Sequence, residues 1–154
     1  MDKEIKKKLA RNWFKLLQNV ICDDIEKLEN KKIKFKSKKW LRNKIKDEGG
    51  GEFRILSDGK IFEKVGVNFS EVHGKFPKEM RQKIPGADKN PNFWASGISV
   101  VMHMKNPYVP AIHFNTRFVY TTHGWFGGGM DVTPCIIDNK EKTFLHKKLK
   151  KMCD

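Results

Sequence analysis

Residues 96–122 read SGISVVMHMKNPYVPAIHFNTRFVYTT, and the fold class follows from this segment. Two runs within it, 98–104 and 111–122, are rich in β-branched and aromatic residues and alternate between apolar and polar side chains. Such alternation is typical of a strand with one buried face. Two prolines, Pro107 and Pro110, interrupt the segment between the runs. We therefore predict an antiparallel strand pair whose loop is longer than that of the tightest hairpins.

The alternation gathers polar side chains on one surface of the predicted strand pair. One face of the first run carries Ser99 and His103, and one face of the second run carries His113, Asn115 and Arg117. A guanidinium is suited to bidentate contact with a carboxylate, and an imidazole exchanges a proton near neutral pH. We interpret this surface as a candidate binding or catalytic site.

A plain solvated surface is the alternative interpretation, because antiparallel sheets commonly expose one face to water. In so lysine-rich a chain, a solvated face should consist mostly of lysine. Residues 111–129 contain no lysine at all. This contrast favours the functional interpretation of the polar side chains.

Two further features could belong to the same site. His103 and His113 could bind a metal ion with His146 as a third ligand, although their spacing carries no specific signal. The glycine triplet 127–129 precedes Asp131. One interpretation is a tight turn in which Asp131 bonds its own backbone. The other is a carboxylate held out toward cationic or N–H groups of a ligand.

Helical periodicity marks both ends of the chain. Residues from about Lys3 to Glu29 predict one amphipathic helix, and Asp138 with Glu141 three residues on predicts the start of a second. The expected apolar stripes are Trp13, Leu17, Val20, Ile21, Ile25 and Leu28 on the first helix, and Leu145, Leu149 and Met152 on the second.

The region after the first helix predicts a short strand and a chain break. Ile33 and Phe35 alternate with lysines, as in a half-exposed strand. The glycine triplet 49–51, which follows this strand, should interrupt regular structure.

A hairpin is predicted around Ser57-Asp58-Gly59, a turn signal between residues 53–56 and a strand that starts at Ile61. Val65, Val67 and Phe69 should share one face of that strand. The order of helix, several strands and helix over residues 1–154 predicts one α+β domain, with an antiparallel β-sheet flanked by helices.

The basic composition suggests an anionic partner. The 154 residues carry a formal net charge of +14, with 27 Lys and only 5 Arg. Arginine binds phosphate better than lysine does, so nucleic acid is the less favoured partner. Residues 31–46 hold nine Lys or Arg and no acid. They form either a phosphate-binding patch or a solvated edge strand, and we favour the edge strand.

The remaining composition indicates a cytoplasmic protein. No apolar run approaches the length of a membrane span, and the first residues lack the apolar stretch of a secretory signal. Cys22, Cys135 and Cys153 have no metal-type spacing. We expect them to be free thiols in a reducing compartment.

Several motifs occur in an informative order along the chain. They are Gly49–Gly51, Asp58–Ser70, Ala95–Ser99, His103, Asn106-Pro107, His113–Arg117 and Trp125–Pro134. Together they resemble oxygen-dependent coproporphyrinogen III oxidase. The similarity covers nearly the whole chain, and an ordered run of motifs is more specific than any single one.

The resemblance implies an activity in haem biosynthesis. Two propionate side chains of coproporphyrinogen III would be decarboxylated oxidatively to vinyls, with molecular oxygen as the oxidant and no organic cofactor. The implied fold is a large antiparallel sheet flanked by helices, and the implied assembly is a homodimer. Bacterial members are often assigned a divalent metal on histidines, and His103, His113 and His146 match three such positions.

The resemblance also implies roles for individual residues. His113 would be the proton donor, and Asp131 would face the pyrrole N–H groups. The substrate-binding residues would be Ser99, Asn115, Thr116 and Arg117. A substrate with four carboxylates gives the Arg117 guanidinium an obvious target.

In a typical member of the family, close to half of the chain would follow the position of Asp154. We therefore expect residues 1–154 to form an incomplete coproporphyrinogen oxidase-like domain, and its activity alone stays open. The alternatives are a non-catalytic porphyrin-binding remnant and a basic nucleic-acid-binding protein.

Overall fold

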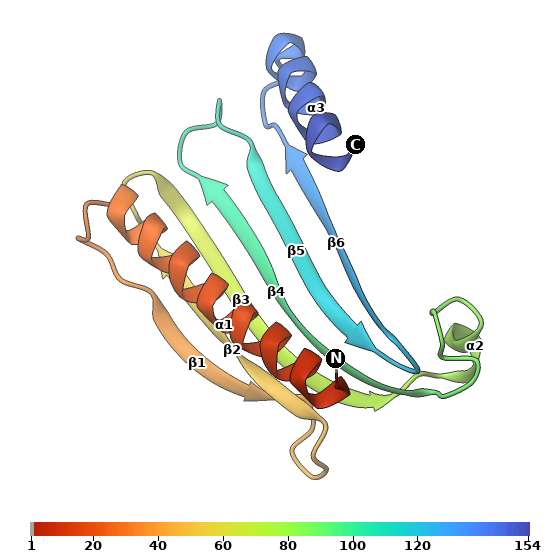
Figure 1. The fold of residues 1–154 in the computed structure, drawn as a ribbon. Helices are drawn as coiled ribbons and strands as arrows, with labels where there is room; N and C mark the ends of the chain where they lie inside the picture. Colours follow the sequence, from red (N-terminus) through yellow and green to blue (C-terminus); the bar gives the residue numbers. More distant parts are fainter. Residues whose placement is uncertain (1) are drawn as a thin grey trace.

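A six-stranded antiparallel sheet organises the protein, whose computed structural model describes residues 2–154 (Figure 1). The elements in chain order are α1 (Lys3–Leu28), β1 (Lys36–Leu41), β2 (Gly49–Ser57), β3 (Phe62–Lys75), α2 (Lys78–Arg81), β4 (Asn92–Met104), β5 (Ala111–Tyr120), β6 (Gly124–Thr133) and α3 (Asn139–Cys153). The predicted α+β fold class is confirmed.

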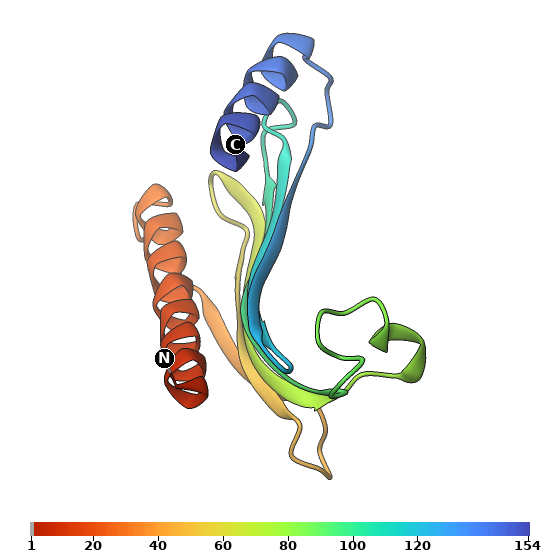
Figure 2. The same cartoon turned by 45° about the vertical axis from the view of Figure 1, so that its right-hand side comes forward.

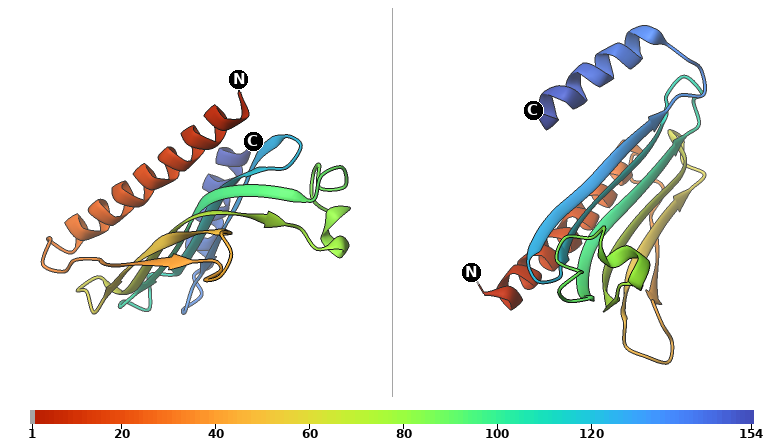
Figure 3. Two further views of the ribbon diagram at one scale, coloured as in Figure 1. Left: turned by 90° about the horizontal axis from the view of Figure 1, so that it is seen from below. Right: turned by 90° about the vertical axis from the view of Figure 1, so that its right-hand side faces the viewer.

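The sheet is a simple meander in the order β1-β2-β3-β4-β5-β6, and each neighbouring pair is antiparallel. Helix α1 lies along one face, whereas α2 and its flanking loop stand on the other side at one end (Figures 2 and 3). The predicted strand pair is confirmed as β4 and β5. Strand β4 begins earlier than expected, at Asn92, and β5 ends at Tyr120.

The face of the sheet under α1 forms the core. Its most deeply buried side chains include Leu56, Val65, Val67, Phe69, Ile98 and Val100. Burying these apolar surfaces is the main favourable contribution to folding. The prediction that Val65, Val67 and Phe69 share one face is confirmed.

Helix α1 buries a different stripe from the predicted one. Asp2 caps its start by accepting hydrogen bonds from the N–H groups of Glu4 and Ile5. Ile25 is buried as predicted, but Trp13, Val20 and Leu28 are about half exposed. The buried residues of α1 are Ala10, Phe14, Gln18, Cys22 and Ile25.

The polar Gln18 is one buried residue that a stripe of apolar residues does not include. Its side-chain amide donates to the carbonyl oxygens of Glu52 and Val67, at 2.9 and 3.1 Å. A buried amide that finds such partners is tolerated in a core. The predicted stripe therefore overlaps the buried side of α1 only in part. Its members Leu17 and Ile21 do pack against the core.

Glu29 joins the end of α1 to the β2–β3 turn. Its carboxylate accepts hydrogen bonds from the backbone N–H groups of Lys60, Ile61 and Phe62, at 2.6, 2.8 and 2.8 Å. Burial alone would raise the pKa of Glu29, but the three N–H groups hold it below its ordinary value. The turn itself is the predicted one, with Asp58 at φ 60° and its N–H bonded to the carbonyl of Glu63.

The region between α1 and β2 departs from prediction in two ways. Ile33 and Phe35 precede the strand and pack against the core, and β1 begins only at Lys36. The glycine triplet 49–51 opens β2 instead of interrupting it. The backbones of β1 and β3 approach Gly50 and Gly51 too closely for a Cβ atom, so glycine serves strand packing here.

The C-terminal helix α3 starts as predicted. Asp138 caps it by accepting hydrogen bonds from the N–H groups of Lys140 and Glu141. The helix projects beyond one end of the sheet (Figures 1 and 2), and none of its residues is buried. Of its predicted stripe, Leu145 and Leu149 are half-buried and Met152 is exposed.

No helix in residues 2–154 is both long and apolar enough to span a bilayer. The three cysteines are free thiols, as predicted, with Cys22 buried and the other two exposed. Burial raises the pKa of the Cys22 thiol to about 11, against the lowering effect of nearby Arg54.

Candidate active site

The sheet face turned away from α1 carries the candidate site. The register pairs Ser99 with Asn115 and Gly97 with Arg117 across β4 and β5, and pairs His113 with Asp131 across β5 and β6. Because residues directly opposite each other point to the same side of a sheet, these side chains share one surface. We call it the polar face: Ser99, His103, His113, Asn115, Arg117 and Asp131.

Two histidines and a carboxylate form a chain of contacts on the polar face. The Nε2 atoms of His103 and His113 lie 3.3 Å apart, and their rings stack with centroids separated by 5.6 Å. The other ring nitrogen of His113, Nδ1, lies 3.7 Å from Oδ2 of Asp131. All three side chains are exposed, so protons can exchange with solvent or a ligand.

Asp131 is oriented by a neighbour that sequence reasoning missed. The hydroxyl of Thr133 donates to Oδ2 of Asp131 at 2.6 Å. Thr133 stands two residues further along β6, so the period-two alternation of a strand could have identified it. Of the two interpretations of residues 127–131, the tight turn is wrong, because these glycines lie inside β6 and pair with Asn115, Thr116 and Arg117.

Arg117 has a free guanidinium on the polar face. Within residues 2–154, no carboxylate oxygen lies within 4.0 Å of it. Its cross-strand neighbours are Gly97 and Gly127, which project no side chains beside it. A guanidinium that lies between two glycines, without a carboxylate beside it, can bind the carboxylate of a ligand.

Trp125 lies beside the Arg117 guanidinium and is not among the residues predicted from the sequence. A Cβ atom at Gly127 would lie 3.1 Å from the Trp125 ring and 3.9 Å from Nε of Arg117. The indole N–H of Trp125 is buried and has no hydrogen-bond partner among residues 2–154. Because side chains alternate along a strand, its position two residues before Gly127 indicates that Trp125 lies on the same face of β6.

Thr116 and His146 do not join the polar face. Thr116 lies opposite Ile98 and Gly128, so its side chain points to the α1 side of the sheet. His146 is exposed on α3. The structure thus brings together Ser99, His103, His113, Asn115, Arg117 and Asp131, and leaves these two outside.

The residues described do not complete the metal site that the resemblance implies. The 3.3 Å between the Nε2 atoms of His103 and His113 would suit two ligands of one tetrahedral ion. Zinc sites in proteins use at least three protein ligands, however. Within residues 2–154, no group of three His, Cys, Asp or Glu side chains is placed to hold a metal ion.

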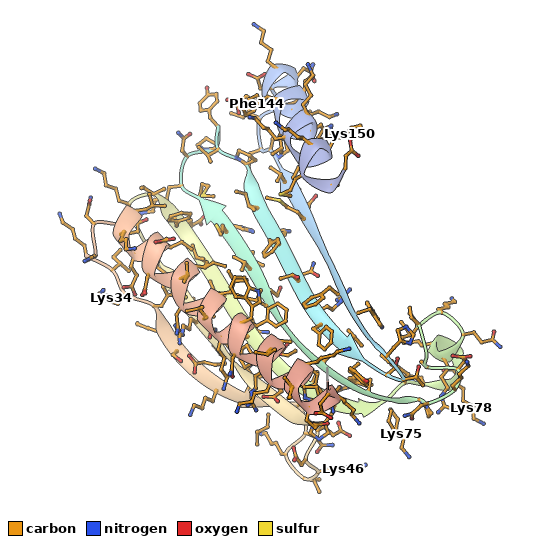
Figure 4. The ribbon with its side chains drawn as sticks, in the orientation of Figure 1. Lys34, Lys46, Lys75, Lys78, Phe144 and Lys150 are labelled. Atoms are coloured by element: carbon orange, nitrogen blue, oxygen red, sulfur yellow. The ribbon has the colours of Figure 1, made fainter. Side chains whose placement is uncertain are left out.

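The basic segment 31–46 lies away from the polar face. It forms the edge strand β1 and the loops that flank it, and most of its lysines are exposed. Lys34 and Lys46 lie at opposite ends of this segment, toward the rim of the molecule (Figure 4). This placement is the one expected of a solvated edge strand.

The fold and the polar face together define an α+β protein with a sheet-borne site suited to a carboxylate ligand. The family model of coproporphyrinogen III oxidase matches residues 9–154. The chain is 44% identical over 156 residues to the oxygen-dependent coproporphyrinogen-III oxidase of Rickettsia felis, and 43% identical to those of Rickettsia akari and Rickettsia typhi. The chain therefore belongs to the coproporphyrinogen III oxidase family.

The alignment covers different shares of this chain and of its relatives. It includes 96% of this chain but only 54% of each of these relatives. The chain thus spans about half the length of the curated relatives it matches.

Proposed function

We propose that this chain takes part in the oxygen-dependent conversion of coproporphyrinogen III to protoporphyrinogen IX in haem biosynthesis. Membership of the family and the name of its relatives support this. The single observation that carries the proposal is Arg117, a guanidinium without a carboxylate partner in residues 2–154, on the same face as His113. The substrate carries propionates that such a group binds.

The proposed reaction removes one carboxylate from each of two propionates. Each propionate side chain, together with O₂ and one proton, gives a vinyl group, CO₂ and hydrogen peroxide. The bond between the carboxylate carbon and the rest of the side chain breaks, and the neighbouring carbon loses a proton. O₂ takes up the two electrons that are released and, with two protons, becomes hydrogen peroxide. A reduced, electron-rich macrocycle reacts with O₂ itself, so the proposal includes no organic cofactor. The protein binds, orients and shields the substrate.

Each residue of the polar face then has a proposed task. Arg117 binds a propionate, His113 delivers the proton, and Asp131 accepts hydrogen bonds from pyrrole N–H groups. His103 lies within hydrogen-bond reach of His113 and completes a path for returning its proton. No step of the proposed reaction passes through a metal ion, because the described residues do not complete a metal site.

The remaining substrate-binding residues act beside these groups. Ser99 and Asn115 lie opposite each other on the polar face and offer hydrogen bonds to the substrate. The proposal gives Thr116 no contact with the substrate, since its own side chain points to the α1 side. The proposal further includes a homodimer and a cytoplasmic location.

The test is an aerobic assay with coproporphyrinogen III, with product followed as porphyrin fluorescence after oxidation. The chain is assayed alone and together with the C-terminal part of the Rickettsia felis oxidase. Arg117→Gln is the test variant. Arg11→Gln is its matched control, because Arg11 lies on α1 and makes only a surface ion pair with Glu71 at 3.6 Å.

Product formation that Arg117→Gln lowers and Arg11→Gln does not is the expected result. Tight porphyrinogen binding without turnover in both preparations would instead indicate a non-catalytic binding protein. The absence of both porphyrinogen binding and turnover would overturn the proposal.

A further inference from the structure

The surface of the polar face continues across β4, β3 and β2, where the proposed reaction uses no residue. Val101 of β4 lies directly opposite His113, and its neighbour on the other side is Gly66 of β3. Ile55 of β2 lies beyond Gly66, and Phe53 stands two residues before Ile55 on the same strand. Because residues directly opposite each other share one side of a sheet, these side chains point to the same side as His113.

Trp40 of the edge strand β1 adds an aromatic ring to this surface. Its indole N–H donates to Oδ1 of Asn68 at 2.9 Å, and Asn68 lies directly opposite Ser99 of the polar face. A Cβ atom at Gly51 would lie 2.8 Å from the Trp40 ring, so the ring packs on the β2 backbone where no side chain stands. We call the following four residues the apolar shelf: Trp40, Phe53, Ile55 and Val101.

The apolar shelf is accessible to a ligand. Val101 is 40% exposed, and the other three side chains are only partly buried. A Cβ atom at Gly66 would meet no atom of residues 2–154 within 4 Å, so the space between Ile55 and Val101 is open. Helix α2 and its loop stand on this side of the sheet only at one end, beyond Lys75 (Figure 2). Contiguous exposed apolar residues of this kind mark a binding surface.

Cationic side chains lie on both sides of the apolar shelf. Arg117 of the polar face lies toward β5. On the opposite side, Lys36 lies opposite Ile55 and Lys38 lies opposite Phe53. Both lysines are exposed. An apolar surface between cations is complementary to a ligand with an apolar body and carboxylates on its rim.

We propose that the apolar shelf binds the ring system of the tetrapyrrole and selects for its ring methyl groups, while Arg117 binds one of its propionates. The inference rests on the proposed function and deepens it, because it assigns the residues that decide which tetrapyrrole is accepted. Methyl groups gain free energy when they leave water to pack on apolar side chains. A tetrapyrrole with acetates in place of these methyls would bring carboxylates onto the shelf, where they lose hydration without gaining a partner.

Fluorescence titration with two porphyrins tests this selection. Coproporphyrin III carries the ring methyl groups, and uroporphyrin III has an acetate in the place of each. Both are titrated against the chain alone and against the chain with the C-terminal part of the Rickettsia felis oxidase. We expect coproporphyrin III to bind roughly tenfold more tightly than uroporphyrin III, because only the acetates lose hydration on the shelf.

Val101→Lys is the variant that tests the shelf. A cation there opposes burial of methyl groups and attracts acetates, so the preference for coproporphyrin III should fall by roughly tenfold. Val109→Lys is the matched control, because Val109 is 43% exposed but lies in the loop between β4 and β5. It should keep the wild-type preference. Partial unfolding lowers both affinities by the same factor, so their ratio reports the shelf itself.

Gly66→Leu tests the open space between Ile55 and Val101. A leucine side chain fills this space from within, so the variant should bind both porphyrins roughly tenfold more weakly. Urea unfolding of the same preparation establishes that the variant is folded.

An unchanged preference in Val101→Lys, an equal change in Val109→Lys, or wild-type affinity in folded Gly66→Leu would overturn the inference. These measurements involve no turnover. If Arg117→Gln weakens porphyrin binding and the shelf variants do not, the proposed function stands and this inference fails. If the shelf variants change the preference of a chain that shows no turnover in either preparation, the inference stands and the proposed function fails.

Discussion

The imidazole rings of His103 and His113 face each other across β4 and β5, with their Nε2 atoms 3.3 Å apart. A hydrogen bond at this distance requires that one Nε2 carries a proton and the other does not. His113 also approaches Asp131 through its second nitrogen, so a single imidazole links a neighbouring base to a carboxylate. This arrangement places two imidazoles and a carboxylate side by side on the polar face.

Replacing Arg117 with Ala should weaken binding of a carboxylate-bearing porphyrinogen by roughly 10- to 100-fold, because a charge-assisted contact contributes about 1.5–3 kcal/mol. Arg117→Lys keeps the charge but loses the bidentate geometry and should recover only part of the affinity. Fluorescence titration with the porphyrin measures both. Equal affinity of wild type and Arg117→Ala would show that the guanidinium does not contact the ligand.

Asp131→Asn should reduce turnover by at least tenfold if a carboxylate accepts pyrrole N–H groups, since the amide keeps the shape and loses the charge. The hydroxyl of Thr133 can still donate to the remaining amide oxygen, so the fold should be retained. The assay is run with the C-terminal part of the Rickettsia felis oxidase present. A control is Asp88→Asn, a change in the loop before β4. Unchanged turnover for Asp131→Asn would remove the proposed role.

Two glycines of the sheet provide a matched pair of stability tests. A Cβ atom at Gly97 would lie 2.6 Å from the carbonyl oxygen of Thr116 and 2.8 Å from Cβ of Arg117. Gly97→Ala should therefore lower the free energy of unfolding by about 1–3 kcal/mol and displace Arg117. A Cβ atom at Gly66 meets no atom within 4 Å, so Gly66→Ala should change stability by no more than about 0.5 kcal/mol. Urea unfolding measures both, and equal effects would contradict the packing argument.

Glu29→Gln should destabilise the fold by about 1–3 kcal/mol, because an amide cannot accept all three of the N–H groups that the carboxylate binds. Glu79→Gln is the control, since Glu79 is an exposed residue of α2. Urea denaturation at pH 7 measures the difference. A variant as stable as its control would mean that the Glu29 contacts contribute nothing net.

The same carboxylate should make stability depend on pH. The pKa of Glu29 is lower in the folded chain than its ordinary value of 4.5, so the folded state binds its proton less readily than the unfolded state. Its contribution is fully present above about pH 4.5 and is lost as the pH falls through the lowered value. Arg54 lowers the pKa of Glu52 in the same sense. The stability difference between wild type and Glu29→Gln should therefore shrink between about pH 6 and pH 3, and a constant difference would contradict this.

Alternation of side chains along strands was the most informative signal in the sequence. It placed Ser99, His103, His113, Asn115 and Arg117 on one face, because a strand has a fixed period and the register of β4 and β5 keeps their apolar faces together. The same rule places Thr116 on the opposite face. A motif match that treats residues 115–117 as one unit cannot make that distinction.

Other features depended on tertiary contacts that no local pattern contains. The buried stripe of α1 follows from Gln18 reaching two carbonyl groups of the sheet. The glycines at 49–51 and 127–129 resemble chain breaks, yet both triplets lie within strands where neighbouring backbone or side chains approach closely. Apart from Trp125 beside Gly127, these partners lie on other elements of the fold, so a local sequence pattern does not contain the constraint.

The Glu29 carboxylate also bears on how the protein can open locally. Its bonds to residues 60–62 close a loop that contains β1, β2 and the whole basic segment 31–46. Thermal fluctuations that fray the edge strand β1 can relieve the crowding of positive charge there while Glu29 keeps the end of α1 bonded to the start of β3. Subglobal unfolding of that kind would leave the polar face on β4, β5 and β6 assembled. The polar face is in this sense insulated from the most strongly charged part of the chain.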